Sequence, residues 1–232
     1  MKAYRKICLM LSFVITIAFL SSNNIYACAN VKEDNKVFSQ NREKSNMIAL
    51  TFDDGPHPRY TPQIIEILKE YGVTATFFII GINAVNYPDA MQAIVDSGCE
   101  IGNHTFSHHT LIRSREESIQ DILRCEKEIS RYINTDKKLL RPPEGKLTAE
   151  AISAANALDY NIILWSVDTL DWNHTPSASI VKNVLSSVKG GDIILMHDYV
   201  SGKNTTCEAL RIIIPQLLAR GYKFVTISEL IA

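Results

Sequence analysis

Side chains that can bind a metal, move a proton or stabilise charge gather in five short segments of the 232-residue chain. In order they are TFDDGP (51–56), HTFSH (104–108), RPPEG (141–145), DTLDW (168–172) and LMHD (195–198). Each follows an apolar run, and each alone has an ordinary explanation as a turn, a cap or a polar loop. Acids, imidazoles and a guanidinium after five separate apolar runs are hard to assign to solvated loops, so the set indicates an active site.

The first two segments point to metal chemistry. Asp53 and Asp54 are adjacent carboxylates, which repel unless they have different roles or share a cation. Alone they fit an Asp-Gly turn, or an aspartyl-phosphate site with magnesium. His104 and His108 are expected on one face of a helical turn, where they can share one metal, and two surface histidines are the alternative. Two imidazoles and one carboxylate suit a catalytic zinc or similar ion better than magnesium, which prefers oxygen ligands.

The other three segments contain a residue that could hold a carboxylate, a ring that could stack on a sugar and a candidate general acid. Arg141 is either part of a rigid proline loop or the holder of a carboxylate, through a bidentate pair that keeps the acid ionised. Trp172 is either packed in a polar loop or stacked on the face of a sugar, beside the acids at 168 and 171. His197 alone is more simply structural, but beside a metal site it is a candidate general acid.

The elements that must position these residues alternate between strand and helix. Apolar runs predict strands over 47–52, 73–80, 100–102, 138–140, 161–167, 192–196 and 222–227. Helical periodicity predicts helices over 61–71, 88–97, 114–134, 148–158, 176–188 and 205–220. This alternation predicts βαβ units and a parallel sheet, either open or closed into a barrel. All five segments then lie at the carboxyl ends of strands, where both architectures place their active sites.

The N-terminal segment is typical of a secretory signal peptide over 1–29. Three positive charges precede the uncharged apolar stretch 7–20, and cleavage is expected after Ala29. The 14-residue stretch is shorter than the ~20 residues that a membrane-spanning helix needs. Lipid attachment at Cys28 is the less favoured alternative, because Tyr26 is a poor residue two positions earlier. Residues 30–45 are polar and without a period, which predicts a linker, and 46–232 form one domain.

Composition excludes several classes of protein. The 24 basic and 25 acidic residues give a net charge of −1, without the basic excess of a nucleic-acid binder. No apolar stretch beyond the first is long enough for a polytopic membrane protein. Three cysteines, Cys99, Cys125 and Cys207, follow the leader without a CxxC pair, which argues against a thiolate zinc site. The composition indicates an ordinary globular domain, and no obligatory protein partner is inferred from the sequence.

Together, TFDDGP, HxxxH, RPPxG, DxxDW and LxH resemble the five ordered motifs of the polysaccharide deacetylase family, the NodB-homology group or carbohydrate esterase family 4. The resemblance covers about 46–232 and implies an α/β fold, a distorted, incomplete (β/α) barrel of about seven parallel strands. The site residues that it implies are the metal ligands Asp54, His104 and His108, the base Asp53 oriented by Arg141, the acid His197 with its partner Asp171, and the substrate-binding residues Trp172, Leu195, Pro143 and Glu144.

The resemblance also implies an activity. We expect a secreted or cell-surface enzyme that removes N-acetyl groups from a glycan containing N-acetylglucosamine, with peptidoglycan as first choice and chitin oligomers as second. The metal is expected to be zinc, with cobalt, nickel or manganese as alternatives. An acetyl xylan esterase and a non-catalytic glycan-binding protein are the alternative functions. The family usually has an aromatic residue where this chain has Glu144, and Asp168 is an alternative partner for His197.

The signal peptide generates the first prediction. N-terminal sequencing of the exported protein is expected to begin near Asn30, because the small residues before it suit the leader peptidase. An exported protein that still begins at Met1 would contradict this cleavage. A lipid on Cys28 would instead make the protein membrane-anchored.

Overall fold

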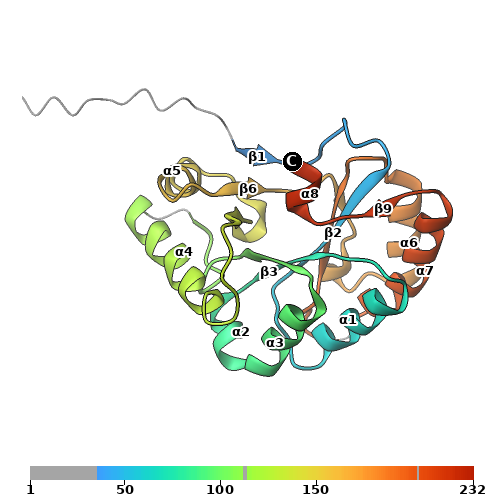
Figure 1. The fold of residues 1–232 in the computed structure, drawn as a ribbon, viewed down its shortest axis with the longest axis horizontal. Helices are drawn as coiled ribbons and strands as arrows, with labels where there is room; N and C mark the ends of the chain where they lie inside the picture. Colours follow the sequence, from blue (N-terminus) through green and yellow to red (C-terminus); the bar gives the residue numbers. More distant parts are fainter. Residues whose placement is uncertain (1–35, 112–113, 203) are drawn as a thin grey trace, which may run out of the picture. The chain divides into compact units, whose positions relative to one another are not determined.

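Parallel strands curl around a common interior at the centre of the molecule (Figure 1). The computed structural model describes residues 36–111, 114–202 and 204–232, so the predicted signal peptide and residues 30–35 lie outside the described residues. In neighbour order the strands are β1 (Val37–Phe38), β6 (Asn161–Ile163), β5 (Leu139–Leu140), β4 (Glu100–Asn103), β3 (Thr76–Ile79), β2 (Met47–Asp53), β8 (Ile193–His197) and β7 (Val167–Asp168), while β9 (Lys223–Phe224) pairs with the start of β2. Within the described residues β1 and β7 do not pair with each other, which confirms the incomplete barrel.

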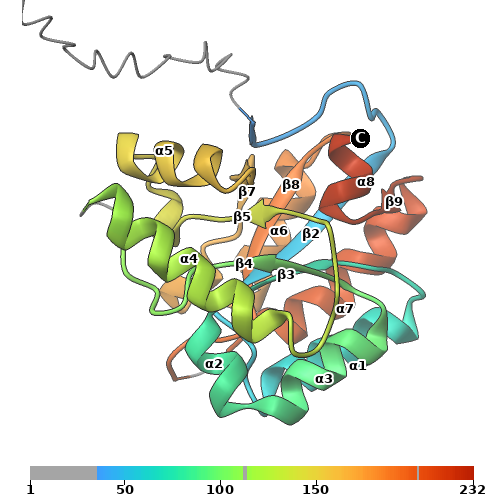
Figure 2. The same cartoon turned by 60° about the vertical axis from the view of Figure 1, so that its left-hand side comes forward.

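Helices cover the outside of this sheet, except for the last one, which packs its apolar side chains into the interior (Figures 1 and 2). They are α1 (Tyr60–Glu70), α2 (Gly81–Asn86), α3 (Pro88–Ser97), α4 (Arg115–Ile129), α5 (Ala149–Ala157), α6 (Ser177–Ser187), α7 (Thr206–Ala219) and α8 (Ile227–Ile231). Helix α1 buries Ile64, Ile67 and Leu68 on one face, as its periodicity predicts. Helix α4 begins with a capping box between Ser114 and Glu117. Among these helices, none combines the length and hydropathy needed to cross a bilayer.

The two faces of β2 show how the fold prepares its site. Leu50 and Phe52 point to the core beneath the helices, where the Phe52 ring stacks on Phe77 at 5.0 Å. Ala49 and Asp53 alternate with them and therefore lie on the face that lines the barrel interior. At the amino ends of the strands this interior is filled by apolar side chains, including those of α8. The polar side chains of the predicted site lie instead toward the carboxyl ends, where β2 ends at Asp53.

The strand predictions were partly wrong at the element boundaries. The run expected over 161–167 is divided into β6 and β7, which occupy separate places in the sheet. The strand expected over 222–227 is only β9, because a capping box at Thr226 and Glu229 starts α8. The helix α2 was not predicted, since its six residues are too few to show a period. The fold class nevertheless agrees with the prediction.

The predicted linker over 30–45 is wrong for residues 37–45, which belong to the folded unit. Strand β1 pairs with β6, and the backbone of Asn41 donates a hydrogen bond of 2.8 Å to Gly191. Arg42 forms a 2.8 Å ion pair with Asp192, whose side chain is almost fully buried. A Cβ at Gly191 would lie 1.9 Å from the carbonyl oxygen of Asn41, so only glycine allows this contact. Backbone pairing and one ion pair hold a segment whose composition shows no apolar pattern.

This contact generates a prediction on stability. Arg42→Ala is expected to lower the free energy of unfolding by about 1–2 kcal/mol, because buried Asp192 loses its cation while keeping two other hydrogen bonds. Those bonds come from the Ser166 hydroxyl and the Lys189 N–H. The matched control is Arg211→Ala, which removes an ion pair with Glu70 whose two side chains are both half exposed, and it should have the smaller effect. Urea unfolding measures both, and equal effects would mean that the contact between Arg42 and buried Asp192 stabilises the domain no more than an exposed ion pair does.

Candidate functional site

A cavity of about 520 Å³ opens where the strands end at their carboxyl side. It is lined by Asp53, Asp54, His104, His108, Glu144, Trp165, Asp168, Trp172, Leu195 and His197. The five sequence segments therefore meet in one place, as parallel strands predict. Three of the predicted site residues, Arg141, Asp171 and Pro143, do not line the cavity but are buried behind it.

The two adjacent aspartates are separated by backbone conformation. Asp53 is the last residue of β2, and Asp54 has a φ of 75°, in the left-handed region. This turn sends the two carboxylates in different directions, which relieves the repulsion between them. The side-chain amide of Asn83 donates a 2.7 Å hydrogen bond to the carbonyl of Asp54 and stabilises the turn. One carboxylate thus stays on the barrel interior while the other faces the histidines.

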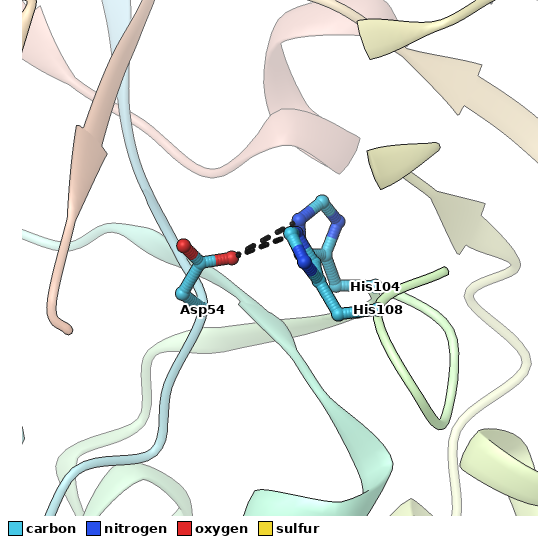
Figure 3. Close-up of side chains that lie close together, drawn as sticks. All are labelled: Asp54, His104 and His108. Atoms are coloured by element: carbon cyan, nitrogen blue, oxygen red, sulfur yellow. Dashed lines mark ion pairs between the residues drawn. The ribbon is translucent and has the colours of Figure 1, made fainter. Parts of the chain in front are cut away.

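Asp54, His104 and His108 converge on one point (Figure 3). The Oδ1 atom of Asp54 lies 3.1 Å from Nε2 of His108 and 3.4 Å from Nε2 of His104. All three candidate ligand atoms lie within 4.8 Å of one another. Asp54 Oδ1 is buried and accepts no well-formed hydrogen bond, so the convergence leaves it in need of a cation. One carboxylate and two imidazoles are a donor set that fits a divalent transition metal.

The loop that carries the histidines differs from the predicted helical turn. Residues 104–110 form no helix, and both Thr105 and His108 have positive φ values, of 67° and 54°. The Thr105 hydroxyl accepts a 3.1 Å hydrogen bond from the N–H of His108, and the side chain of Asn103 accepts one from Thr105 N–H. Side-chain hydrogen bonds close this turn, which the four-residue spacing alone could not reveal.

The protonation of His104 is set by a neighbour. Its Nδ1 lies 2.7 Å from the carbonyl oxygen of Arg141, an atom that can only accept a hydrogen bond. The proton therefore belongs on Nδ1, which leaves the lone pair of Nε2 facing Asp54 and available to a metal. Burial alone would raise the pKa of Asp54, but the imidazoles of His104 and His108, when they are protonated, lower it well below its usual range.

Arg141 holds the other aspartate from inside the barrel. Its guanidinium is completely buried and donates a 2.7 Å hydrogen bond from Nη1 to Asp53 Oδ1. The same nitrogen donates to the hydroxyl of Thr51, and its other nitrogens donate to the carbonyls of Ile163 and Leu164. The expected bidentate pair is therefore wrong, because backbone carbonyls take the remaining donors. The contact leaves Oδ2 of Asp53 on the side of the histidines, 3.7 Å from Nε2 of His104.

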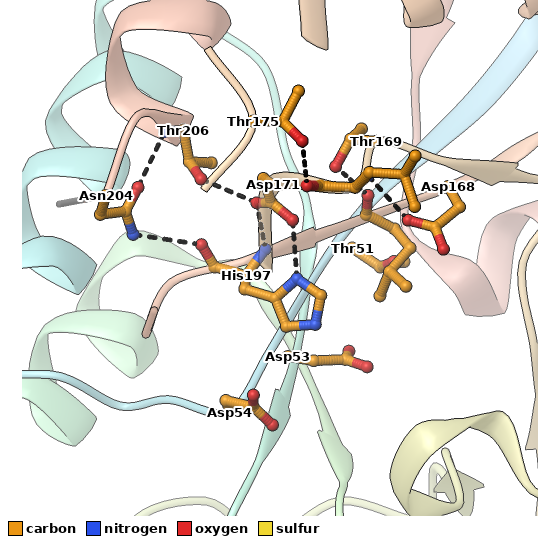
Figure 4. A network of polar contacts seen from close by, with 12 residues as sticks. Thr51, Asp53, Asp54, Asp168, Thr169, Asp171, Thr175, His197, Asn204 and Thr206 are labelled. Atoms are coloured by element: carbon orange, nitrogen blue, oxygen red, sulfur yellow. Dashed lines mark hydrogen bonds and ion pairs between the residues drawn. The ribbon is translucent and has the colours of Figure 1, made fainter. Parts of the chain in front are cut away.

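On the opposite side, His197 is held by Asp171 and not by Asp168 (Figure 4). Its Nδ1 lies 2.7 Å from Oδ1 of Asp171, whose Oδ2 accepts the backbone N–H of His197 at 2.8 Å. Burial lowers the pKa of His197, but the hydrogen bond and charge of Asp171 outweigh it and raise the pKa to about 9. Asp168 instead accepts the N–H of Leu170 and lines the cavity.

The predicted substrate-binding residues occupy different depths. Leu195, on β8, and Trp172, half exposed after β7, both line the cavity. Pro143 is buried, and the next residue, Glu144, has a φ of 59° and an ion pair of 2.6 Å with Lys146. The carboxylate that replaces the usual aromatic ring is thus partly neutralised and lies at the cavity wall.

Three contributors were missed by the sequence analysis. Trp165 lines the cavity, although its apolar context predicted only a strand. Thr206 donates a 2.7 Å hydrogen bond to Oδ2 of Asp171, and Asn204 accepts the N–H of Thr206 while donating to the carbonyl of His197 (Figure 4). These two residues follow the fifth segment at a distance that carries no motif, so nothing in their spacing could have revealed them.

Comparisons with known proteins agree with this arrangement. The family model described as polysaccharide deacetylase matches residues 40–163. The peptidoglycan-N-acetylglucosamine deacetylase of Bacillus cereus is 40% identical over 194 residues, which are 82% of this chain and 90% of that protein.

Solved structures give the same result. A crystal structure of a peptidoglycan N-acetylglucosamine deacetylase bound to a hydroxybenzamide-type compound has a TM-score of 0.81 at 35% identity, covering 84% of this chain and 92% of the other. A pseudoenzyme of carbohydrate esterase family 4 from Bacillus anthracis has a TM-score of 0.78 at 30% identity, covering 84% and 69%. These matches show that the chain belongs to the polysaccharide deacetylase family.

Proposed function

We propose that this protein is a secreted, metal-dependent deacetylase that hydrolyses the N-acetyl groups of a glycan containing N-acetylglucosamine, with peptidoglycan as the first choice. The observation that carries the proposal is the convergence of Asp54, His104 and His108 beside Asp53, a carboxylate that Arg141 holds separately. The name of the Bacillus cereus relative supports peptidoglycan as the substrate. The predicted signal peptide supports action outside the cell.

The metal would be held by Asp54, His104 and His108, with zinc as the first choice. When bound, such a cation lowers the pKa of water and stabilises negative charge that develops on a carbonyl oxygen. Only three protein ligands converge there among the described residues, which leaves room for water and substrate, as a catalytic site requires.

Asp53 has the surroundings of a general base. Arg141 donates a charge-assisted hydrogen bond to Oδ1, so that Oδ2 is the oxygen left to accept a proton from the attacking water. The backbone N–H of Glu144, just after Pro143, is the protein donor that we assign to the tetrahedral oxyanion. Leu195 and Trp172 supply apolar surface for the acetyl methyl group.

His197 has the surroundings of a general acid. Asp171 binds Nδ1, and the ring lies over Asp53 and Asp54, so Nε2 is the nitrogen that can reach the substrate (Figure 4). Because Asp171 favours the imidazolium, His197 carries the proton that the departing amine needs. The C–N bond breaks as the nitrogen takes this proton, and the products are acetate and a free amino sugar.

The decisive experiment measures acetate release, because a pseudoenzyme is among the similar structures. Acetylated peptidoglycan fragments, chitin oligomers and acetylated xylan are compared with protein that is metal-stripped and then restored with zinc. We expect release from the N-acetylated glycans only after restoration. Release from xylan alone would favour the esterase, and no release from any substrate would reject an enzyme.

Variants of the paired aspartates test the division of roles in the same assay. Asp53→Asn should keep the metal and lose turnover by at least ~10²–10⁴-fold, the usual contribution of a general base. Asp54→Asn and His104→Ala should lose metal and turnover together, because each removes a ligand. Metal content is measured by mass spectrometry beside the rate. Equal metal loss in Asp53→Asn and Asp54→Asn would show that the two carboxylates do not have separate roles.

The role of His197 as general acid is tested by the pH dependence of the rate. The imidazolium of His197 is present below its pKa of about 9 and is lost above it, so the rate should fall as the pH rises through that value. Asp171→Asn removes the charge that raises this pKa and should move the upper limb to lower pH, whereas Asp168→Asn should not. His197→Ala should damage amide cleavage more than hydrolysis of an activated aryl acetate, whose leaving group needs no proton. If the fall in rate at high pH shifts only in Asp168→Asn, the functional partner of His197 is Asp168 and not Asp171.

A further inference from the structure

Aromatic rings outside the cavity form a continuous cluster beside it, made of His57, Tyr60, Tyr87 and Tyr199. The His57 ring stacks on Tyr60 at 4.9 Å and on Tyr199 at 5.1 Å, and Tyr87 lies 6.2 Å away. The mechanism proposed above uses none of these residues. Tyr199 is 42% exposed, which is unusual for a ring that already covers another ring.

The cluster lies next to the reacting groups because of its place in the chain. His57 is three residues after Asp54, and Tyr199 is two residues after His197. Two residues of extended chain span at most about 7 Å, so the backbone of Tyr199 stays close to the acid. Since β8 lies between β7 and β2, exposed rings follow neighbouring strand ends, with Trp172 after β7 and Tyr199 after β8.

Buried contacts hold the ring stack in place before any ligand arrives. The hydroxyl of Thr61 accepts the backbone N–H of His57 at 2.7 Å and donates to the carboxylate of Asp198, which is completely buried. Nδ1 of His57 accepts the N–H groups of Arg59 and Tyr60. The loops after β2 and β8 are thus joined through Thr61, so the backbone that carries His57 and Tyr199 is held in place before a ligand arrives, and His57 stacks on the Tyr199 ring.

A polymeric substrate needs such a surface. The cavity of about 520 Å³ is of the size that encloses one small ligand, and a glycan longer than that must continue over the rim. The C–H face of a pyranose packs well on an aromatic face, which carries partial negative charge and apolar area. Resting on the function proposed above, we infer that Tyr199, backed by His57, is a subsite that stacks the sugar next to the one being deacetylated.

The test combines turnover with binding. For N-acetylglucosamine and its oligomers, Tyr199→Ala should lower the ratio of kcat/KM for the hexamer to that for the monosaccharide by about tenfold, since only a chain has a neighbouring sugar that reaches the ring. Tyr199→Phe should restore the ratio, because stacking uses the ring face and not the hydroxyl. Ile212→Ala, at an equally exposed apolar position on α7, is the matched control and should leave the ratio unchanged. Metal content and melting temperature show that each variant is folded.

Calorimetric binding of the hexamer and the monosaccharide to metal-stripped protein separates this inference from the function itself. Wild-type protein should bind the hexamer more tightly than the monosaccharide, and Tyr199→Ala should remove most of the difference. If it does so while no variant releases acetate, the subsite stands and the deacetylase proposal fails. If Tyr199→Ala keeps the wild-type length dependence, or Tyr199→Phe fails to restore it, the stacking subsite is wrong even where acetate is released.

Discussion

The rest of the site depends on the buried contact between the guanidinium of Arg141 and the carboxylate of Asp53. Burying a guanidinium is costly unless each of its nitrogens is hydrogen-bonded and an opposite charge is close. Arg141 meets this condition with two residues of β2, the carbonyls of Ile163 and Leu164, and the ring of Phe78, whose centroid lies 4.1 Å away. Its own carbonyl sets the tautomer of His104. Through its side chain and its backbone carbonyl, Arg141 therefore ties Asp53, a candidate metal ligand and three parts of the barrel together.

Two ion pairs lie on opposite sides of the cavity. Arg141 holds the carboxylate of Asp53, while Asp171 holds the ring of His197 and raises its pKa. In the proposed mechanism these two groups serve as base and acid, and each is placed by its own buried partner. Thr206 and Asn204 complete the second pair by fixing Asp171 and the backbone of His197.

Sequence patterns predicted the strand ends and the residue types at the site, because parallel strands bring successive carboxyl ends to one edge. They could not predict features that depend on backbone conformation, such as the left-handed Asp54 or the non-helical turn between His104 and His108. They also missed β1, which is held by pairing with β6 and by the contact between Arg42 and Asp192 rather than by an apolar period. Long-range partners of this kind leave no local signal.

The placement of the chain ends decides how the domain can be oriented when it is attached to something else. Lys36 precedes β1 at the amino ends of the strands, and it lines a surface hollow together with Ile231 and Ala232, the end of α8. The reacting groups lie at the carboxyl ends of the same strands. A tether joined at either end would therefore leave from the far side of the barrel, and a domain held to a surface in this way would present its cavity outward, toward a polymer that approaches from the surroundings.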